Sequence, residues 1–379
     1  MAYRIPFNRP TQTDRDLANV QEALANGHLS GDGRFTKHCH RIFEETLGVP
    51  KVLLTTSCTH ALEMAAFLLD IKPGDEVIVP AFTFVSSVNA FVIRGARPVF
   101  CDVRPGSFCI DERQLEQLIT PKTRAIVVVH YAGIGCQMDV IGEIAKSRGI
   151  TVIEDNAHGL YGKFQGQWLG TFSDMATLSF HETKNFSCGE GGALLLSNPS
   201  LIERAEVIRE KGTDRSKFHR GQVDKYSWVD LGSSYLPSEV LAAILAAQLD
   251  DRENIQARRH ALWGRYDREL RDWTSSHDVA VPEVPPDRSH SAHMYFVVLP
   301  TVAFRDGLVA HLKAHDILAV SHYVPLNVSP MGQRLGGRPG DCPVAERLAE
   351  RLLRLPFFTQ MTDAEQSDVI QAVSDYRPS

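Results

Sequence analysis

The sequence lacks the cysteine pattern, the long apolar runs and the basic charge that mark several classes of protein. Its seven cysteines are scattered and never form C-x-x-C, which argues against a disulfide framework and a zinc site. No apolar run approaches bilayer-spanning length, and the first residues, MAYRIPFNRPTQTDRD, lack the apolar stretch of a signal peptide. The formal net charge of −6 argues against general nucleic-acid binding. We therefore expect a cytoplasmic protein with no metal, no membrane span and no nucleic-acid partner.

What the sequence does contain is typical of an enzyme with a large core. The chain has 379 residues, of which 43% are hydrophobic and 23% charged. Apolar, β-branched runs alternate with helical patterns, and several runs, such as AIVVVHY, are apolar throughout, as in strands covered on both faces. The alternation predicts an α/β fold with a mostly parallel sheet. The predicted strands are 52–55, 76–80, 97–103, 125–131, 151–155, 176–181 and 193–197, with helices that include 59–70, 111–119 and 138–147.

The pattern changes near residue 238. From there to about residue 273 the sequence predicts one long helix, apolar at its start and increasingly charged later. A proline-rich loop, VPEVPPDRSHS, follows, and beyond it we expect strands at 294–299 and 318–323, a helix at 304–315 and further terminal helices. We interpret this as a large α/β domain over residues 1–250 and a small α+β domain over residues 251–379.

Polar residues that follow the predicted strands are candidates for a site, because ligands of an open parallel sheet bind beyond the carboxyl ends of its strands. In VLLTTSCTHALEM, the small residues Ser57, Cys58 and Thr59 lie between a strand and a helix. Their hydroxyls and the backbone N–H groups of the helix start suit a phosphate, although for this segment alone simple helix capping is the favoured explanation. No G-K-[ST] follows, so this is not a P-loop.

Two further segments supply a carboxylate and an amine. In ITVIEDNAHG, Asp155 ends a predicted strand, where it would hold a protonated ring nitrogen or simply cap the next element, and His158 follows three residues later. In ATLSFHETKNFSCGEGGALLLS, Lys184 lies between an apolar strand and a glycine-rich turn, with Ser179 five residues earlier. A lone loop lysine is usually a solvated charge. A constrained, partly desolvated lysine has a lowered pKa and can form an imine.

Taken in order, these motifs resemble the DegT/DnrJ/EryC1/StrS family of sugar aminotransferases, within the aspartate-aminotransferase superfamily of pyridoxal-phosphate (PLP) enzymes. The resemblance extends from about Ile5 to the C-terminal helices. The strings HETKNFSCGEGG, REKGTDRSKFHRGQVDKYSWVDLGSSYL and SHYVPL are most similar to the branch that makes dTDP-4-amino-4,6-dideoxygalactose. The resemblance implies the aspartate-aminotransferase-like fold (PLP fold type I) with seven strands, and a homodimer with shared active sites.

The resemblance also implies residue roles. Lys184 would bind PLP covalently and move the proton, Asp155 would pair with the ring nitrogen, and His158 would contact the phenolic oxygen of the ring. Phe84 would stack on the ring. The phosphate would be held by Ser57, Cys58, Thr59 and Ser179. For the nucleotide sugar we expect contacts in the loop 27–33 and in the SHYVPL string, at Leu29, Ser30, His322, Tyr323 and Asn327.

Two positions depart from the family pattern. Many relatives carry an asparagine, supplied by the partner subunit to the phosphate, where this chain has Leu236. Ser233, Ser234 or Tyr235 would take over that contact, or it is absent. Relatives often read H-Y-x-P-L-H, whereas here Asn327 takes the last position. Asparagine can donate and accept hydrogen bonds but has no titratable proton.

The expected reaction is transfer of the amino group of L-glutamate to C4 of a dTDP-4-keto-6-deoxyhexose, with the galacto product slightly favoured. The gluco epimer or C3 amination is the alternative. A more distant one is a nicotinamide-dependent nucleotide-sugar oxidoreductase, but its best fingerprint, GIGCQM, has Met138 in place of the third glycine. A dehydratase is disfavoured because relatives of that kind replace the lysine with histidine. With Lys184, Asp155 and the phosphate residues present, nothing favours a cofactor-binding regulator without catalysis.

Overall fold

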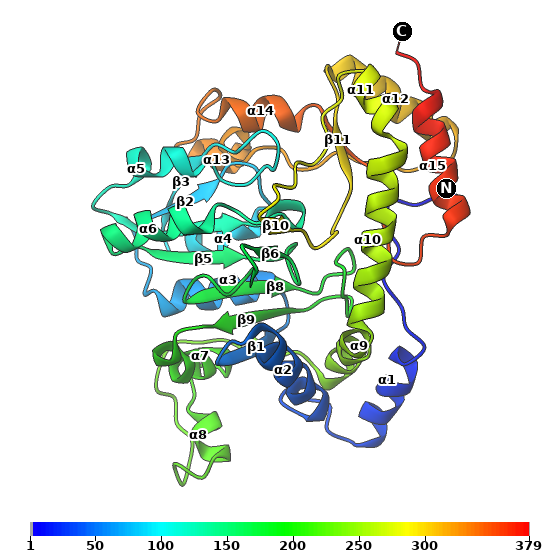
Figure 1. The fold of residues 1–379 in the computed structure, drawn as a ribbon. Helices are drawn as coiled ribbons and strands as arrows, with labels where there is room; N and C mark the ends of the chain where they lie inside the picture. Colours follow the sequence, from blue (N-terminus) through cyan, green and yellow to red (C-terminus); the bar gives the residue numbers. More distant parts are fainter. Residues whose placement is uncertain (1–2, 379) are drawn as a thin grey trace.

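A seven-stranded sheet lies at the centre of the structure (Figure 1). The computed structural model describes residues 3–378. Strand β9 runs antiparallel to both of its neighbours, and the other pairings are parallel, so the predicted mostly parallel sheet is confirmed. All seven predicted strands are present. In sheet order they are β1 (Lys51–Thr55), β9 (Gly192–Leu196), β8 (Met175–Ser179), β5 (Thr151–Asp155), β4 (Thr123–Val129), β2 (Glu76–Pro80) and β3 (Arg97–Cys101).

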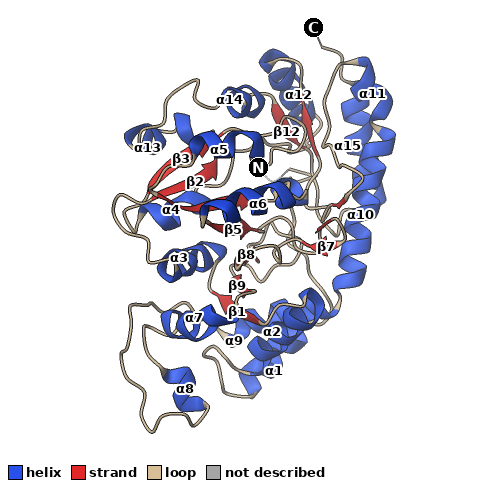
Figure 2. Ribbon diagram, turned by 60° about the vertical axis from the view of Figure 1, so that its left-hand side comes forward, coloured by secondary structure: helices blue, strands red, loops and turns tan. Residues whose placement is uncertain are grey.

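Helices cover both faces of this sheet (Figure 2), which explains why several of its strands, such as β4, are almost entirely apolar. Successive strand residues alternate between the two cores: Val77 and Val79 lie on one face, and Ile78 on the other. The first face is covered by α3 (Cys58–Leu68), α4 (Ser86–Val92) and α7 (Ile202–Arg209). The second is covered by α2 (Arg34–Leu47), α5 (Leu115–Leu118), α6 (Met138–Arg148) and α9 (Glu239–Asp250), with α1 (Asp16–Ala25) packed on α9.

The predicted long helix at 238–273 is three helices, α9, α10 (Arg252–Glu269) and α11 (Arg271–Ser276). The chain leaves helical geometry at Asp251, between α9 and α10. Charged and polar side chains on either side of it form hydrogen bonds at the two helix ends. Arg252 donates to the Leu249 carbonyl at 3.0 Å, and Asn254 donates to the Asp251 carboxylate at 2.7 Å. In Figure 1, α10 runs from α9 along one side of the molecule toward the C-terminal elements.

A second core gathers around the C-terminal elements. It includes Leu262, Val297, Leu308 and Val369, and also Ile5, which forms a parallel bridge with Ile317. Its elements are the antiparallel pair β11 (Phe296–Val298) and β12 (Leu352–Arg354), with α10, α11, α12 (Val302–Ala314) and α15 (Asp363–Asp375). These form the predicted small α+β unit. The division at residue 250 stays a prediction, and Ile5 shows that the N-terminal segment crosses it.

The predicted strand at 318–323 is wrong. Only Val320 forms an isolated bridge there, with Arg354, because the chain then bends so that His322 and Tyr323 stack with ring centroids 3.6 Å apart. The strand that pairs with β11 is β12, which the sequence analysis missed inside a helical-looking charged run. The remaining elements are α8 (Arg215–His219), α13 (Pro330–Arg334), α14 (Pro343–Ala349), β6 (Lys163–Phe164), β7 (Gln167–Trp168) and β10 (Arg288–Ser289).

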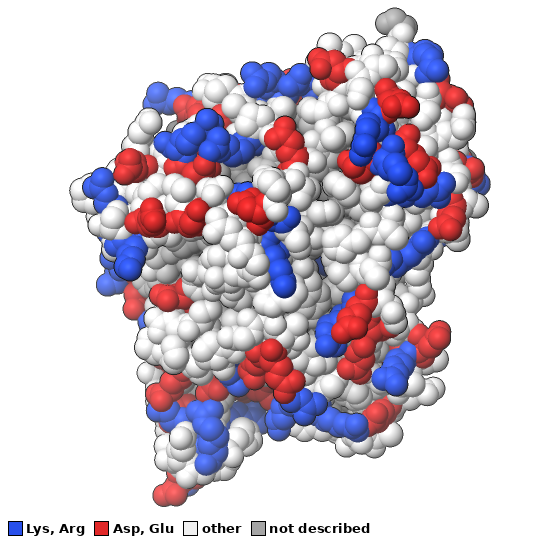
Figure 3. Space-filling model, in the orientation of Figure 1, with Lys and Arg blue, Asp and Glu red and all other residues white. Residues whose placement is uncertain are grey.

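The surface carries charges of both signs. Lysine and arginine are interspersed with aspartate and glutamate over the face in Figure 3. None of the helices within residues 3–378 has the length and apolar character needed to cross a membrane. All seven cysteines are free thiols, and six of them are buried.

Candidate active site

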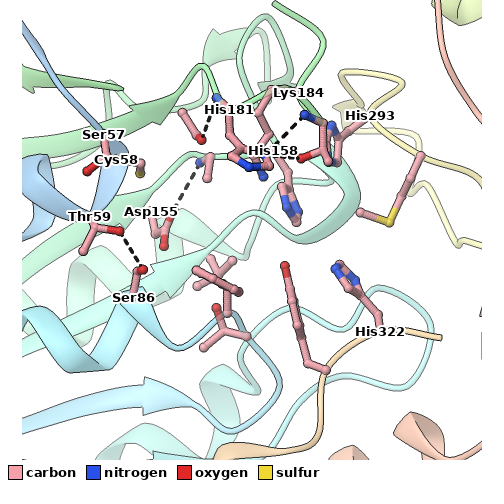
Figure 4. A pocket seen from close by; sticks show the side chains of 18 of the residues that line it. Ser57, Cys58, Thr59, Ser86, Asp155, His158, His181, Lys184, His293 and His322 are labelled. Carbon is pink, nitrogen blue, oxygen red and sulfur yellow. Dashed lines mark hydrogen bonds between the residues drawn. The ribbon is translucent and has the colours of Figure 1, made fainter. Parts of the chain in front are cut away.

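A cavity of about 730 Å³ opens at the carboxyl ends of the parallel strands, between the sheet and the C-terminal elements. One side, here called the sheet wall, consists of the segments that follow β1, β2, β5 and β8 (Figure 4). The opposite side, the C-terminal wall, consists of His293, Met294, His322, Tyr323, Arg354 and Phe357. Phe7 and Asn8 of the N-terminal segment also line the cavity. The site therefore lies where a parallel α/β sheet places its ligands.

The start of α3 forms an anion-binding corner of the sheet wall. Ser57 caps the helix by accepting from the His60 N–H at 3.1 Å, and the hydroxyl of Thr59 lies 2.7 Å from that of Ser86. Strand β9 passes so close that a Cβ on Gly192 would lie 2.3 Å from the Cys58 nitrogen. Only glycine fits there. The free N–H groups of a helix start and two or three hydroxyls lining a cavity are suited to a phosphate.

Asp155, the last residue of β5, supplies a buried carboxylate. It accepts hydrogen bonds from the Ser87 hydroxyl at 2.7 Å and from the Ala157 N–H at 3.2 Å. Burial raises the pKa of Asp155, and the bonds from Ser87 and Ala157 and the charge of Lys184 oppose that rise. A positively charged ring nitrogen in the cavity would favour the ionised form further.

Lys184 projects into the cavity from the turn after β8 (Figure 4). Its backbone N–H donates to the His181 carbonyl at 2.9 Å, which fixes the turn. Burial lowers the pKa of Lys184 to about 8, although the nearby Cys58 and Asp155 oppose that shift. The lysine is therefore no solvated surface charge, and a substantial fraction of its amine is free at mildly basic pH.

Three histidines meet across the cavity. The His158 ring stacks on His293 with centroids 4.2 Å apart, and it lies nearly parallel to His322 at 6.2 Å. His293 Nδ1 is 2.9 Å from Asn185 Oδ1, and His322 Nδ1 is 2.7 Å from the Tyr131 hydroxyl. Burial is the main reason that the pKa of each of the three histidines lies well below the usual range. The rings are therefore neutral. His158 Nδ1 is buried and has no hydrogen-bond partner within residues 3–378.

The residues that line the cavity fit PLP. The helix start suits its phosphate, Asp155 its ring nitrogen, the unpaired His158 nitrogen a polar ring substituent, and Lys184 its aldehyde carbon. No other buried amine lines the cavity among the described residues. A lysine, a strand-end aspartate and a phosphate corner on a large, mostly parallel α/β sheet define a PLP-dependent enzyme.

Comparisons with known proteins agree. The model of the DegT/DnrJ/EryC1/StrS aminotransferase family matches residues 10–374, and the chain belongs to this family. GDP-perosamine synthase of Escherichia coli O157:H7 is 30% identical, with 98% of each chain covered. The aminotransferase TlmJ from Streptoalloteichus hindustanus is 32% identical with a TM-score of 0.88 and 98% of each chain covered. Spr1654 from Streptococcus pneumoniae, solved in its PLP form, is 27% identical with a TM-score of 0.90 and the same coverage. This protein is thus a PLP-dependent sugar aminotransferase.

The structure brings most of the predicted site residues together in the one cavity. Those that line it are Ser57, Cys58, Thr59, Phe84, Asp155, His158, Ser179, Lys184, His322 and Tyr323. Phe84 stands at the rim with 56% of its surface exposed, and its ring centroid lies 6.0 Å from that of Tyr323. The strand ends that the sequence marked are therefore neighbours in space.

Three predicted residues do not line this cavity. Leu29 and Ser30 are exposed on the loop before α2, and the Leu29 carbonyl accepts from the Glu239 N–H at 3.1 Å. Asn327 is buried in the turn η4 (Leu326–Val328), where its amide donates to the Arg338 carbonyl at 3.0 Å and to Glu346 at 2.7 Å. Leu236 packs against Gly31: a Cβ added to Gly31 would lie 2.8 Å from the side chain of Leu236.

Sequence reasoning missed several lining residues. On the sheet wall these are Thr83, Ser86, His181 and Glu190, and on the C-terminal wall His293, Met294, Arg354 and Phe357. The run TFVSS, which begins three residues after the end of a predicted strand, could have indicated the residues of the α4 start. Arg354 gave no such signal, because it lies among the alternating charges of ERLAERLLRLP.

Proposed function

We propose that this enzyme transfers the amino group of L-glutamate to C4 of a dTDP-4-keto-6-deoxyhexose and releases the 4-amino-4,6-dideoxyhexose nucleotide, with the galacto epimer favoured. The observation that carries the proposal is the convergence of Lys184, Asp155 and the α3 start on one cavity. The choice of sugar rests on the strings HETKNFSCGEGG and SHYVPL. A relative whose name specifies GDP-perosamine supports a nucleotide-sugar substrate and makes GDP-linked ketosugars the matched comparison.

Different residues of the cavity bind the cofactor, transfer the proton and contact the sugar. The α3 start and Ser179 would hold the phosphate of PLP, and Asp155 would stabilise the positive charge on its ring nitrogen. PLP bound in this way would supply an electron sink. Lys184 Nζ moves the proton during amino transfer, because its lowered pKa lets it both accept and return a proton near neutral pH. Neutral His322 and Tyr323, on the opposite wall, offer hydrogen bonds to an uncharged sugar.

We also propose that the enzyme works in the cytoplasm as a homodimer with shared active sites. Apolar side chains are exposed around the cavity rim and on the projecting segment around α8, which Figure 1 shows extending away from the sheet. They include Phe84, Val85, Phe218, Trp228 and Leu231. A second copy would cover them, and Leu29 and Ser30, which lie outside the cavity of their own chain, would face the partner's site.

The test is a visible spectrum of the purified protein, then borohydride reduction and peptide mapping, with light scattering for the oligomeric state. A yellow band that bleaches with L-glutamate, and a label fixed on Lys184, supports the assignment. Conversion of dTDP-4-keto-6-deoxyglucose, identified by NMR, then determines position and epimer. The proposed substrate would be wrong if the enzyme bleaches with L-glutamate but then aminates only a GDP-linked ketosugar, or places the amine only at C3 of the sugar.

A further inference from the structure

A second cavity, of about 260 Å³, lies apart from the active site, and the described residues that line it differ from those of the active site. It is bounded by the segment after β3, the turn after β4 and the loop that leads into β10, with the exposed Pro105 and Glu283 among its lining residues. Cys109 and Cys136 both line it. Of the other five cysteines, which all lie within residues 3–378, Cys58 lines the active-site cavity and the rest line neither.

The sulfurs of Cys109 and Cys136 are held against each other. The Cys109 Sγ lies 3.3 Å from the Ile134 carbonyl oxygen, and the Cys136 Sγ lies 3.2 Å from the Val129 carbonyl oxygen. The segment after β4 therefore fixes both side chains. The two thiols are also hydrogen-bonded to each other, with Cys136 as the donor. A disulfide needs its sulfurs to approach to about 2 Å, so this contact is the geometry from which such a bond forms.

The surroundings make the two thiols unequal. The hydrogen bond from Cys136 is the main reason that the pKa of Cys109 falls to about 7, and the nearby His130 lowers it further while burial opposes the fall. Burial raises the pKa of Cys136 well above its ordinary value. The pKa of each of the other five described cysteines is also raised by burial. A partly ionised thiol beside a protonated one is the arrangement of a nucleophilic and a resolving cysteine.

Two other pairs show what ordinary buried cysteines look like in this protein. Cys101 lies close enough to Cys342 to interact with it electrostatically, and Cys39 and Cys188 are related in the same way. Burial raises the pKa of all four thiols, and none of these four described residues lines either cavity. Proximity alone therefore does not make a reactive pair, because an oxidant must also reach an ionised sulfur.

We propose that Cys109 and Cys136 are a redox-active thiol pair that a peroxide oxidises to a disulfide. The Cys109 thiolate attacks one oxygen of hydrogen peroxide, the O–O bond breaks, and Cys109 becomes a sulfenic acid as the first water leaves. The sulfur of Cys136 then attacks that of Cys109, the S–O bond breaks, and the second water leaves. The two thiols lose two electrons and two protons in total, and the peroxide is reduced to two waters.

A metal site is the other use that proteins make of paired thiols. Within residues 3–378, no group of three or more histidine, cysteine, aspartate or glutamate residues is placed to hold a metal ion. The pair has the second cavity for access and a partner for each sulfur, which is what reversible thiol oxidation requires. In a cytoplasmic protein such a bond is transient and is reduced again by cellular thiols.

The test treats the purified holoenzyme with hydrogen peroxide and maps its peptides without reduction. The expected product is a single disulfide between Cys109 and Cys136, with a whole-protein mass lower by two hydrogens, and dithiothreitol should restore both thiols. The Cys109 thiol should be lost at least about tenfold faster than the Cys101 thiol, because only the first is partly ionised and lines a cavity. This mapping needs no variant.

Three variants assign the roles within the pair. Cys136→Ser keeps a hydrogen-bond donor but removes the resolving sulfur, so the reaction should stop at a Cys109 sulfenic acid, which dimedone traps. Cys109→Ser should abolish both the disulfide and the dimedone adduct. Cys101→Ser is the matched control, because serine can still donate to the Asp111 carbonyl that Cys101 contacts at 3.5 Å, and the disulfide should form as in the wild type. Circular-dichroism melts check that each variant is folded.

The proposal is wrong if peroxide leaves Cys109 and Cys136 as thiols, or if it joins Cys101 to Cys342 equally fast. It is also wrong if wild-type Cys109 is oxidised to the sulfinic acid while Cys136 stays a thiol, because the second sulfur then does not reach the first. Mass and peptide mapping use no substrate, so these outcomes are independent of which sugar the enzyme aminates.

Discussion

The two walls of the cavity are built differently. The sheet wall takes its side chains from the ends of β1, β2, β5 and β8, where regular hydrogen bonding fixes the backbone and the next helix or turn starts at once. The C-terminal wall takes His293, His322 and Tyr323 from segments outside the helices and strands, held by bonds such as Tyr131 to His322. The difference indicates a division of labour. A rigid edge suits a cofactor, and an irregular wall suits a substrate that changes between half-reactions.

Lys184→Ala should have the largest effect. Turnover should fall by at least about 10³-fold, because the variant lacks the amine that we propose attaches PLP and moves the proton. The measurement is steady-state amination, with peptide mapping after borohydride and a circular-dichroism melt to show that the fold persists. Near-normal multiple turnover by this variant would contradict the assignment of Lys184.

Asp155→Asn should come next, with a loss of turnover of roughly a hundredfold. Asparagine keeps the shape and can still accept one of the bonds that Ser87 and Ala157 donate, but it has no charge for the ring nitrogen. Ser87→Ala is the graded control, because it removes one neutral bond and should cost no more than about tenfold. An equal loss in the two variants would mean that Asp155 acts only by packing.

The rate at which the cofactor-free protein takes up PLP should depend on pH through Lys184. Since the free amine reacts, and burial lowers the pKa to about 8, the rate should rise roughly tenfold between about pH 7 and pH 9. The Asp155 charge holds this pKa up, so Asp155→Asn should shift the midpoint to lower pH. A midpoint near the ordinary lysine value would contradict the burial of the amine.

Tyr131→Phe tests the contact that holds His322 of the C-terminal wall against the segment after β4. It removes the hydroxyl that lies 2.7 Å from His322 Nδ1, so the KM for the nucleotide sugar should rise by about twofold to tenfold, with L-glutamate unaffected. Tyr295→Phe is the matched control, because the Tyr295 hydroxyl is buried without a partner in the described structure. An effect on L-glutamate alone would place His322 on the donor side.

Asn327→Ala should have the smallest effect on catalysis. Its amide donates to the Arg338 carbonyl and to Glu346, away from the cavity, so the free energy of unfolding should fall by about 1–3 kcal/mol while the KM for the nucleotide sugar changes less than about twofold. Thermal melts and steady-state kinetics measure the two quantities. A large rise in KM at unchanged stability would restore Asn327 to the substrate site.

Prediction from the sequence succeeded for polar residues that stand at the ends of apolar strands. Ser57, Asp155 and Lys184 each follow an apolar strand, and the carboxyl ends of parallel strands meet at one edge, so their convergence followed from topology. The strand at 318–323 failed because only Val320 bridges a neighbouring residue, Arg354, and the next residues, His322 and Tyr323, line the cavity instead of pairing. The single helix at 238–273 failed because charged side chains around Asp251 satisfy the helix ends just as well as another helical turn would.

The sequence alone determined the α/β class, the seven strands of the sheet, the lysine and the aspartate, because periodicity and strand-end chemistry are local properties. Only the tertiary structure decided which residues form the second wall. His293 and Arg354 are 61 positions apart in the chain, and β11 and β12 bring them to one cavity through pairing between distant segments. Whether a charged side chain is solvated or faces a ligand depends on what packs around it, and that is a property of the folded chain.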